Sequence, residues 1–347
     1  MSAVIVNKYR SEDRAEVDAL SQRVFGQEWV AASARRWDWQ YRQNPYAPKP
    51  QIWIARDEGK IVGQYATMPV RLVVAGKEID ASWGMDVMVA PERQRQGLGE
   101  VLFRTWDDHT GASLGLGLST ASHRLFQKLK WPEVGPVPCL VKMLSPKAFA
   151  RPGWPSFLNA LIGLVARPYL WFTSARMPED VDVRHITAFD ERFTTLWEEI
   201  HSKFSFAVRR DTTYLQWKYV GLPHVRYRIV TIEIGGVLKG YAVYRHWDEA
   251  RGRVTALVDF VADPDDRMAF PALLSVIEDE AHKAGSDKIR AFVMNSAFRN
   301  TMQSCGYAQV PSTIEFVAKV NAVPVGPDYY ADTSAWHVTF GDSDQDR

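Results

Sequence analysis

The chain has 347 residues, of which 46% are hydrophobic and 24% charged, a composition that is ordinary for a soluble globular protein. This length predicts about two domains. A formal net charge of +1 gives no electrostatic reason to expect a nucleic acid or an anionic membrane as partner. The two cysteines, Cys139 and Cys305, lie far apart and predict neither a disulfide framework nor a metal site. Residues 1–14 carry charges and no apolar segment, so we expect no signal peptide and a cytoplasmic protein.

The N-terminal part of the chain predicts alternating strands and helices. Residues 1–10 alternate enough to predict a strand, and residues 11–25 carry apolar side chains at helical spacing. Residues 51–56 and 61–74 then predict two strands joined by a turn at Gly59. Strands and helices mix along the chain, which predicts an α/β protein with mixed sheets.

Residues 84–109 are the most informative stretch. Residues 85–90 are apolar and end at Pro91, which predicts a strand, and residues 98–109 predict a helix. The inward positions of this helix are expected to be Leu98, Val101, Leu102, Thr105 and Trp106. Residues 94–99 form the turn between them. Backbone N–H groups and the helix dipole favour an anion there, and two glycines let a bulky group approach. The stretch therefore predicts a phosphate or pyrophosphate cradle.

Three nucleotide motifs compete for this turn. The phosphate-binding loop of NTPases would need Gly-x4-Gly-Lys-Ser/Thr, and a dinucleotide-binding turn would need a third glycine; the sequence has neither here. The pattern that fits is Gln/Arg-x-x-Gly-x-Gly after Val-x-Pro, carried by Val89, Pro91, Gln94, Gly97 and Gly99. This pattern resembles the acetyl-CoA pyrophosphate site of the GNAT acyltransferase superfamily. The alternative is an ordinary strand–turn–helix connection.

The resemblance implies acetyl-CoA as the acyl donor, with no metal. Main-chain amides of residues 94–99 would hold the pyrophosphate, and residues 87–89 would bind the pantetheine arm like an added strand. The expected cofactor-binding residues are Val87, Met88, Val89, Gln94, Arg95, Gln96, Gly97, Leu98 and Gly99.

The middle of the chain predicts a connection between two domains. Residues 136–182 are rich in proline, which disfavours a regular core element. Their apolar part, residues 157–172, is interrupted by Arg167-Pro168 and is shorter than the ~20 residues that span a bilayer. We expect a helix packed on a domain face there, with docking to a membrane surface or a partner as the alternative. The expected domains are 1–135 with the acetyl-CoA site and 183–347.

The second half repeats features of the first. Trp39-x-Tyr41-x3-Pro45 reappears as Trp217-x-Tyr219-x3-Pro223, and Asp86-x4-Pro91 reappears as Asp259-x4-Pro264. Shifts that agree within a few residues predict two tandem GNAT-like domains, against chance spacing of aromatic residues. After Pro264 the second copy has no glycine and gains carboxylates in residues 265–271, so we expect it to be degenerate and not to bind CoA.

The resemblance leaves the catalytic groups open. The second signature of the family, Asn-x6-Tyr-x3-Gly-Phe, survives in the first copy only in its spacing and aromatic ends, and its tyrosine position is Phe126. In many relatives this tyrosine protonates the departing thiolate, which Phe126 cannot do. Asp86 is our first candidate for the base that deprotonates the amine, although the aligned Asp259 leaves a structural role open. His123 is the second candidate.

We therefore expect a GNAT-type N-acyltransferase that moves an acetyl or other acyl group from CoA to a primary amine of a small metabolite. An amino sugar or a cell-envelope precursor is our expected acceptor. The alternative is a non-catalytic module that binds or senses acyl-CoA and docks a partner through its second domain. The acidic C-terminal end, with Asp342 and Asp344, predicts a final strand with a solvated end; alternatively, these carboxylates line the acceptor site. The sequence sets no oligomeric state.

Overall fold

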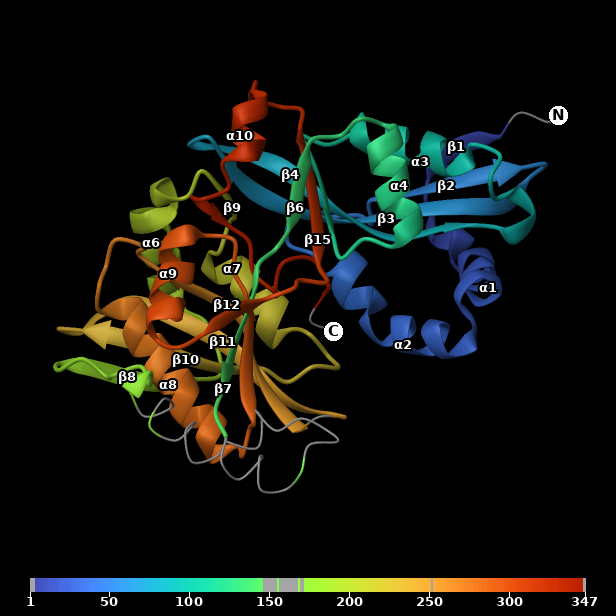
Figure 1. Cartoon of the computed structure of the whole chain (residues 1–347). Coiled ribbons are helices and arrows are strands. Elements are labelled where there is room, and N and C mark those ends of the chain that lie inside the picture. The colour runs from blue at the N-terminus through green and yellow to red at the C-terminus, as the bar shows by residue number, and fades with distance from the viewer. Residues whose placement is uncertain (1–3, 146–154, 156–167, 169–171, 251, 346–347) are drawn as a thin grey trace. The chain divides into compact units, whose positions relative to one another are not determined.

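The computed structural model describes residues 4–145, 155, 168, 172–250 and 252–345 (Figure 1). The chain divides into two compact units, each with its own mixed sheet. Unit 1 contains Met1–Gly135, Gly221–Val225 and Ile314–Ala331. Unit 2 contains Pro136–Val220, Arg226–Thr313 and Asp332–Arg347. The predicted α/β class with mixed sheets is confirmed.

Unit 1 is built on one mixed sheet. Its strands, in spatial order, are β1 (Ile5–Lys8), β2 (Ile52–Asp57), β3 (Lys60–Val74), β4 (Lys77–Val89), β5 (Ala112–Leu116), β15 (Glu315–Val320) and β6 (Glu133–Pro136). Its α-helices are α1 (Arg14–Phe25), α2 (Gln27–Trp37), α3 (Leu98–Asp107), α4 (Thr120–Lys128) and α10 (Pro327–Ala331). β4 and β5 run parallel, whereas β3 and β4 are antiparallel, so β4 is where the direction of pairing changes.

The buried face of α3 fixes the loop that precedes it. The buried residues of α3 are Leu98, Leu102, Phe103 and Trp106. The indole N–H of Trp106 donates to Ser82 Oγ at 2.8 Å, which satisfies the one polar atom of that side chain in the core. Val101 is 48% exposed, so the prediction that it points inward is wrong. At about 100° per residue the four buried positions centre on one side of the helix, and Val101 lies more than about 90° from that centre.

Unit 2 is built on a second mixed sheet. Its strands, in spatial order, are β8 (Val181–Ile186), β10 (Arg228–Ile234), β11 (Val237–Glu249), β12 (Gly252–Ala262), β13 (Lys288–Phe292), β7 (Cys139–Met143) and β14 (Ala308–Val310). Its α-helices are α6 (Glu191–Ile200), α7 (Thr212–Leu215), α8 (Ala269–Lys283) and α9 (Ser296–Ser304). β9 (Phe206–Val208) and β16 (Trp336–His337) form a short parallel pair. Leu273, Leu274 and Ile277 of α8 are buried.

The two sheets share one strand order. From β1 to β5 in unit 1 and from β8 to β13 in unit 2, four antiparallel strands lead to one parallel neighbour. The next strand comes from a distant part of the sequence in both, β15 in unit 1 and β7 in unit 2. Both Trp-x-Tyr motifs lie in π-helical turns, at Asp38–Arg42 and at Gln216–Val220. The tandem repeat remains a prediction, which this shared order supports.

One part of the predicted interdomain connection is a strand. Cys139–Met143 is β7, which pairs with β13 and β14. The remainder of the proline-rich connection lies largely outside the described residues, so the apolar helix expected there stays a prediction, as do the domain limits. Among the residues that the structure describes, no helix combines the length and the apolar character needed to cross a bilayer.

Unit 2 contains a buried ionic cluster. Arg210 is 1% exposed, and its Nε lies 3.1 Å from Asp259 Oδ1 while its Nη2 lies 2.9 Å from Asp342 Oδ2. Thr339 donates its hydroxyl to Asp259 Oδ1 at 2.9 Å and its N–H to Asp342 Oδ2 at 2.8 Å. Although burial opposes the charged form, the two carboxylates raise the pKa of Arg210 well above its usual value. The expected solvated end of the chain is therefore wrong, because Asp342 is an internal partner of Arg210.

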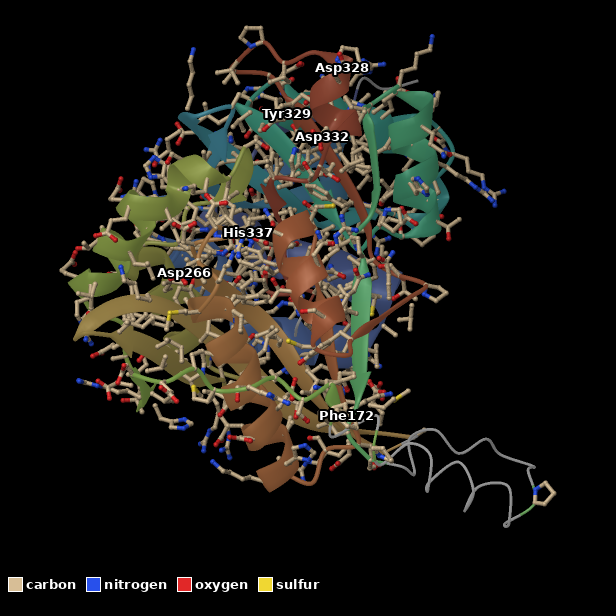
Figure 2. All side chains as sticks on the ribbon, turned by 60° about the vertical axis from the view of Figure 1, so that its left-hand side comes forward. Phe172, Asp266, Asp328, Tyr329, Asp332 and His337 are labelled. Carbon is tan, nitrogen blue, oxygen red and sulfur yellow. The ribbon has the colours of Figure 1, made fainter. Side chains whose placement is uncertain are left out.

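A buried histidine in unit 2 predicts loss of stability in mild acid. His337, which Figure 2 labels, is 1% exposed, and its Nε2 donates to the carbonyl of Phe260 at 2.9 Å. Burial, together with the charge of Arg210, holds the pKa of His337 well below 6.5. The unfolded chain takes up a proton near pH 6.5 and the folded chain does not. The free energy of unfolding should therefore fall by about 1.4 kcal/mol per pH unit below 6.5 from this group.

Urea unfolding at pH 7.5 and pH 5.5 measures this effect. Burial also lowers the pKa of His246, which adds a contribution of the same sign. The variant His337→Leu should lose about 1.4 kcal/mol of the difference between the two pH values. A general loss of stability in the variant cancels in this comparison. An unchanged pH dependence in His337→Leu would refute the assignment.

Candidate functional site

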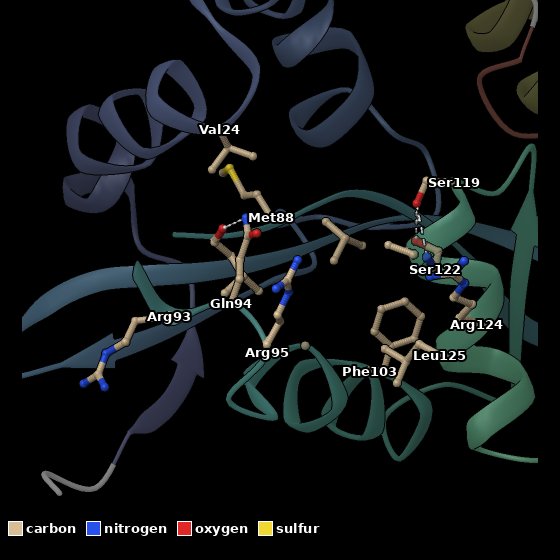
Figure 3. A pocket seen from close by; sticks show the side chains of 14 residues that line it. Val24, Met88, Arg93, Gln94, Arg95, Phe103, Ser119, Ser122, Arg124 and Leu125 are labelled. Atoms are coloured by element: carbon tan, nitrogen blue, oxygen red, sulfur yellow. Dashed lines mark hydrogen bonds between the residues drawn. The ribbon is translucent and has the colours of Figure 1, made fainter. Parts of the chain in front are cut away.

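A pocket of about 510 Å³ lies in unit 1 beside the end of β4 (Figure 3). Its walls come from α1, β4, the turn before α3, α3 itself and α4 with the residue before it. Six of the predicted cofactor-binding residues line it: Val87, Met88, Val89, Gln94, Arg95 and Gly99. The other three, Gln96, Gly97 and Leu98, line a hollow of about 240 Å³ together with Val4, Arg93 and Val101. The structure thus places the nine residues around one turn.

The turn has the backbone conformation of an anion cradle. A 3₁₀ turn at Pro91–Arg93 follows β4, and α3 begins at Leu98 with Gly97 before it. Arg95 and Gly97 both have left-handed conformations, with φ of 62° and 84°. A Cβ added at Gly97 would meet nothing within 4 Å, and one at Gly99 would meet only a Leu125 methyl at 3.9 Å. The first N–H groups of a helix have no intrahelical acceptor, so those of α3 can donate to an anion.

Side-chain bonds hold the turn in place. Gln94 donates from Nε2 to the carbonyl of Val89 at 3.1 Å, and Gln96 donates from Nε2 to the carbonyl of Glu92 at 2.9 Å. Arg93 forms a salt bridge with Asp57 of β2 and donates to Gln96 Oε1 at 3.1 Å. The glutamine of the motif therefore ties the turn to the strand end and leaves main-chain groups for a ligand.

The charges around the pocket suit an anion. Its described lining residues include three arginines and no carboxylate: Arg95 and Arg124, together with Arg93, which already pairs with Asp57. Glu100, in the first turn of α3, is neutralised because Lys128 lies 2.6 Å and Arg104 2.9 Å from its carboxylate. Hydrogen bonds from Lys128 and then Arg104 lower the pKa of Glu100. Our sequence reasoning missed Arg124; a basic residue one turn into the next helix was the available signal.

β4 contains a bulge next to the pocket. Gln64 of β3 pairs with Met88 and Ala66 pairs with Met85, so Asp86 and Val87 together face the single residue Tyr65. Asp86 has φ of 43°, in the left-handed region. Its Oδ2 accepts a hydrogen bond from the Tyr41 hydroxyl at 2.6 Å, and Arg36 Nη2 lies 3.5 Å from its Oδ1. The Asp86 side chain is only 5% exposed. The first base candidate thus lies on the predicted strand, but its carboxylate is turned into the protein.

The second base candidate lies on α4. Ser119 caps this helix by accepting a hydrogen bond from the Ser122 N–H at 3.1 Å. Ser119, Ser122 and Arg124 line the pocket, whereas His123, between two of them, does not. His123 is half-buried. The pocket therefore brings the turn and the start of α4 together, and it leaves Asp86 and His123 outside its described lining.

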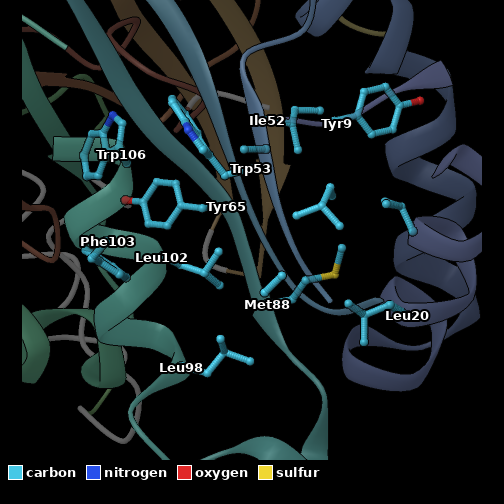
Figure 4. Close-up of a cluster of buried hydrophobic side chains, with 14 of the residues drawn as sticks. Tyr9, Leu20, Ile52, Trp53, Tyr65, Met88, Leu98, Leu102, Phe103 and Trp106 are labelled. Carbon is cyan, nitrogen blue, oxygen red and sulfur yellow. The ribbon is translucent and has the colours of Figure 1, made fainter. Parts of the chain in front are cut away.

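Phe126 belongs to an aromatic group below the pocket. Its ring lies 4.9 Å from that of Phe103 and 4.5 Å from that of Trp131. Phe103 also lines the pocket, and it contacts the ring of Tyr65 at 4.7 Å. Figure 4 shows Phe103 and Trp106 of α3 beside Tyr65, with Leu20 of α1 on the other side of the strands. The tyrosine position of the family signature is thus occupied by a ring that packs the core.

The family model described as an acetyltransferase (GNAT) domain matches residues 6–114, which include the bulged strand, the turn and α3. Residues 6–114 of this chain thus match a GNAT domain. Its mixed sheet, the glycine turn after β4 and the α3 that follows are the elements that surround the pocket. The superfamily predicted from the sequence is confirmed for this part of the chain.

Solved structures share the fold over most of the chain. A GCN5-related N-acetyltransferase from Anabaena variabilis is 13% identical, with a TM-score of 0.63 over 92% of this chain and 73% of that one. A probable N-acyltransferase from Enterococcus faecalis is 14% identical, with a TM-score of 0.62 over the same shares. N-myristoyltransferase from Saccharomyces cerevisiae, with bound myristoyl-CoA, is 12% identical. Its TM-score is 0.54 over 92% of this chain and 83% of the yeast chain. A comparison with curated protein sequences finds no match. The GNAT domain and this fold support an acyltransferase.

Unit 2 departs from the GNAT cradle at the corresponding helix start. Asp266 Oδ1 accepts hydrogen bonds from the N–H groups of Met268 at 2.7 Å and Ala269 at 3.3 Å, just where α8 begins. Figure 2 labels Asp266. Pro271, in the first turn of α8, has no N–H to donate. A carboxylate of the chain itself thus occupies the amides that an external anion would need.

Proposed function

We propose that this protein is an N-acyltransferase that moves an acyl group from CoA to a primary amine, with its CoA site in the GNAT domain. The observation that carries the proposal is the pocket in which the glycine turn, the end of β4 and three arginines meet. We further propose acetyl-CoA as the donor and a small metabolite, such as an amino sugar or a cell-envelope precursor, as the acceptor. We propose that the degenerate second copy binds no CoA, because Asp266 fills its helix start.

The residues present fit a CoA thioester. The N–H groups at the start of α3 would bind the pyrophosphate, and Arg95 would add positive charge beside it. Val87, Met88 and Val89 line the pocket along β4, where an extended chain of amides could pair with the strand. An N–H at the bulge would donate to the thioester oxygen as negative charge develops on it. These roles need no metal.

The amine must lose a proton, because an alkyl ammonium with a pKa near 10.4 is mostly charged at neutral pH. We propose Asp86 as the group that accepts it through a water molecule, and His123 as the alternative. Asp86 lies on β4, the strand that carries the proposed thioester contacts. His123 needs a change of side-chain direction to reach the pocket, since its neighbours Ser122 and Arg124 already line it.

The leaving group needs no tyrosine in this proposal. A free thiol has a pKa near 8.5, so a thiolate departs far more readily than an alkoxide. The buried ring of Phe126 supplies no proton, and solvent at the open pocket would protonate the thiolate after it leaves. The predicted consequence is that transfer depends on the base and on positioning, with no separate catalytic acid.

Phe126 also favours one alternative function. A protein that only binds or senses acyl-CoA would keep the cradle and lose the proton donor, and its second unit would be free to dock a partner. A second alternative concerns the donor. The yeast N-myristoyltransferase structures that share this fold hold myristoyl-CoA, so a longer acyl chain than acetyl belongs in any test of donors.

Free-thiol release from acetyl-CoA and from longer acyl-CoAs, measured with a panel of amines, tests the proposal. Transfer to at least one primary amine is expected. The variants Asp86→Asn and His123→Ala separate the two candidate bases, because asparagine tolerates the left-handed backbone and still accepts the Tyr41 bond but takes up no proton. The variant that removes the base should lower kcat by about 10²–10⁴-fold with little change in the Kd for CoA.

Two outcomes would count against these assignments. Tight acyl-CoA binding without thiol release for any amine would favour the sensing module. Variants of both Asp86 and His123 that keep kcat within twofold would place the base elsewhere.

A further inference from the structure

The bulge of β4 is held by side chains that lie far from it in the sequence. Tyr41 belongs to the π-helical turn Asp38–Arg42, and Arg36 belongs to the last turn of α2. Both reach Asp86 in the middle of the bulge, Tyr41 through its hydroxyl at 2.6 Å and Arg36 through Nη2 at 3.5 Å. Neither side of this contact is exposed, since the Arg36 and Asp86 side chains are 8% and 5% accessible. The contact is therefore part of the interior of unit 1.

The backbone at Asp86 needs such support. A residue other than glycine costs free energy in the left-handed region, although aspartate is tolerated better than most. A β-bulge leaves the extra residue out of the ladder, and it bends the strand. Gln64 donates from Nε2 to the carbonyl of Asp86 at 3.2 Å, which satisfies one group that the ladder leaves unpaired. Together these bonds hold the Asp86 backbone and leave Val87 in the lining of the pocket.

We propose that Tyr41 and Arg36 are positioning residues that act through Asp86 to hold the β4 bulge in the conformation that presents Val87 to the acyl thioester. The proposal rests on the proposed acyl transfer, because it assigns the bulge to the thioester end of CoA. The glycine turn lies at the other end of residues 87–99 and is held by bonds of its own, from Gln94 and Gln96. Loss of the Tyr41 bond should consequently disturb catalysis and spare the binding of CoA.

The variant Tyr41→Phe removes the hydroxyl and keeps the ring, which packs against Trp37 at 5.4 Å. We expect kcat for acyl transfer to fall at least tenfold while the Kd for CoA stays within twofold. The matched control is Tyr219→Phe, which removes the corresponding hydroxyl from the second π-helical turn, in unit 2, and should leave both constants unchanged. Arg36→Met, which removes the cation beside Asp86, should lower kcat in the same way as Tyr41→Phe.

Hydrogen exchange gives a readout that does not need activity. The amides of residues 86–88 should exchange at least tenfold faster in Tyr41→Phe than in the wild type or in Tyr219→Phe, while those of residues 98–102 in α3 stay the same. If the wild type released no thiol with any amine but Tyr41→Phe still exchanged faster, the proposed function would be wrong and the positioning role would stand. An unchanged kcat with unchanged exchange in Tyr41→Phe would overturn the positioning role itself. Equal losses of kcat and CoA affinity would also overturn it, because a general loss of structure would then account for both.

Discussion

The variant Gly97→Glu is expected to weaken the binding of CoA by more than about 100-fold. Gly97 stands before α3 with φ of 84°, and a side chain added there meets no neighbour within 4 Å. The glutamate therefore fits without a clash, and its carboxylate comes to the place where the pyrophosphate is proposed to bind. Two unit charges about 5 Å apart near a protein surface repel by about 3 kcal/mol, which corresponds to more than 100-fold in affinity. Calorimetric titration with CoA measures the change.

The control for this variant is Gly59→Glu. Gly59 has φ of 83°, and an added Cβ likewise meets nothing within 4 Å, so the conformational cost and the change of charge are the same. It lies in the turn between β2 and β3 and lines neither hollow beside the glycine turn. We expect its Kd for CoA to stay within twofold of the wild type. If Gly97→Glu bound CoA as tightly as Gly59→Glu, the glycine turn would not be part of the CoA site.

The second large effect is expected in the buried ionic cluster of unit 2. The variant Arg210→Met removes the cation between Asp259 and Asp342, which are 0% and 1% exposed. Burial already raises the pKa of Asp342 against the attraction of Arg210. Two carboxylates without a cation must then either take up protons or stay charged in a dry interior. Breaking a buried ion pair in this way costs about 3–5 kcal/mol, a large part of the stability of an ordinary domain.

Urea unfolding at pH 7.5, followed by tryptophan fluorescence, measures this loss. The matched control is Arg253→Met, since Arg253 is 45% exposed and pairs with an 81% exposed Asp248 at 3.8 Å. We expect the control to change the free energy of unfolding by less than about 0.5 kcal/mol. If Arg210→Met lost less than 1 kcal/mol, the cluster would be shown to contribute little. Because carboxylates without a cation are easier to keep neutral in acid, the loss should shrink as the pH falls toward 5.

The buried cluster also bears on the candidate base. The predicted repeat aligns Asp259 with Asp86, and the carboxylate of Asp259 accepts hydrogen bonds from Arg210 and Thr339 inside unit 2. Asp86 has a similar setting with Arg36 and Tyr41 in unit 1. In each unit an aspartate is thus held by an arginine and a hydroxyl group, and a catalytic role for Asp86 would be additional to that structural role. The Asp86→Asn variant tests the catalytic role of Asp86, whereas Tyr41→Phe tests its structural role.

Local signals in the sequence were sufficient where neighbouring residues decide the outcome. The run from Met85 to Ala90 predicted the strand, Pro91 its end, and Gly97 and Gly99 the turn that opens onto α3. Turn and helix geometry depend on φ preferences and on apolar spacing over a few residues, so the sequence suffices for them. The GNAT superfamily followed from the same few residues, and the family match at residues 6–114 agrees with it.

Other features depend on partners that no local pattern names. The sequence predicts that Asp342 belongs to a polar, solvated end. In the structure it is buried and paired with Arg210, which lies more than a hundred residues earlier in the chain. The places of β15 and β7 in the two sheets, and the approach of Arg36 and Tyr41 to Asp86, likewise join segments far apart in the chain. The sequence by itself determined the turn and the class of ligand that it suits. Only the tertiary structure decided which charges are paired and what supports the bulge, because those outcomes depend on which distant side chains share a low-dielectric interior.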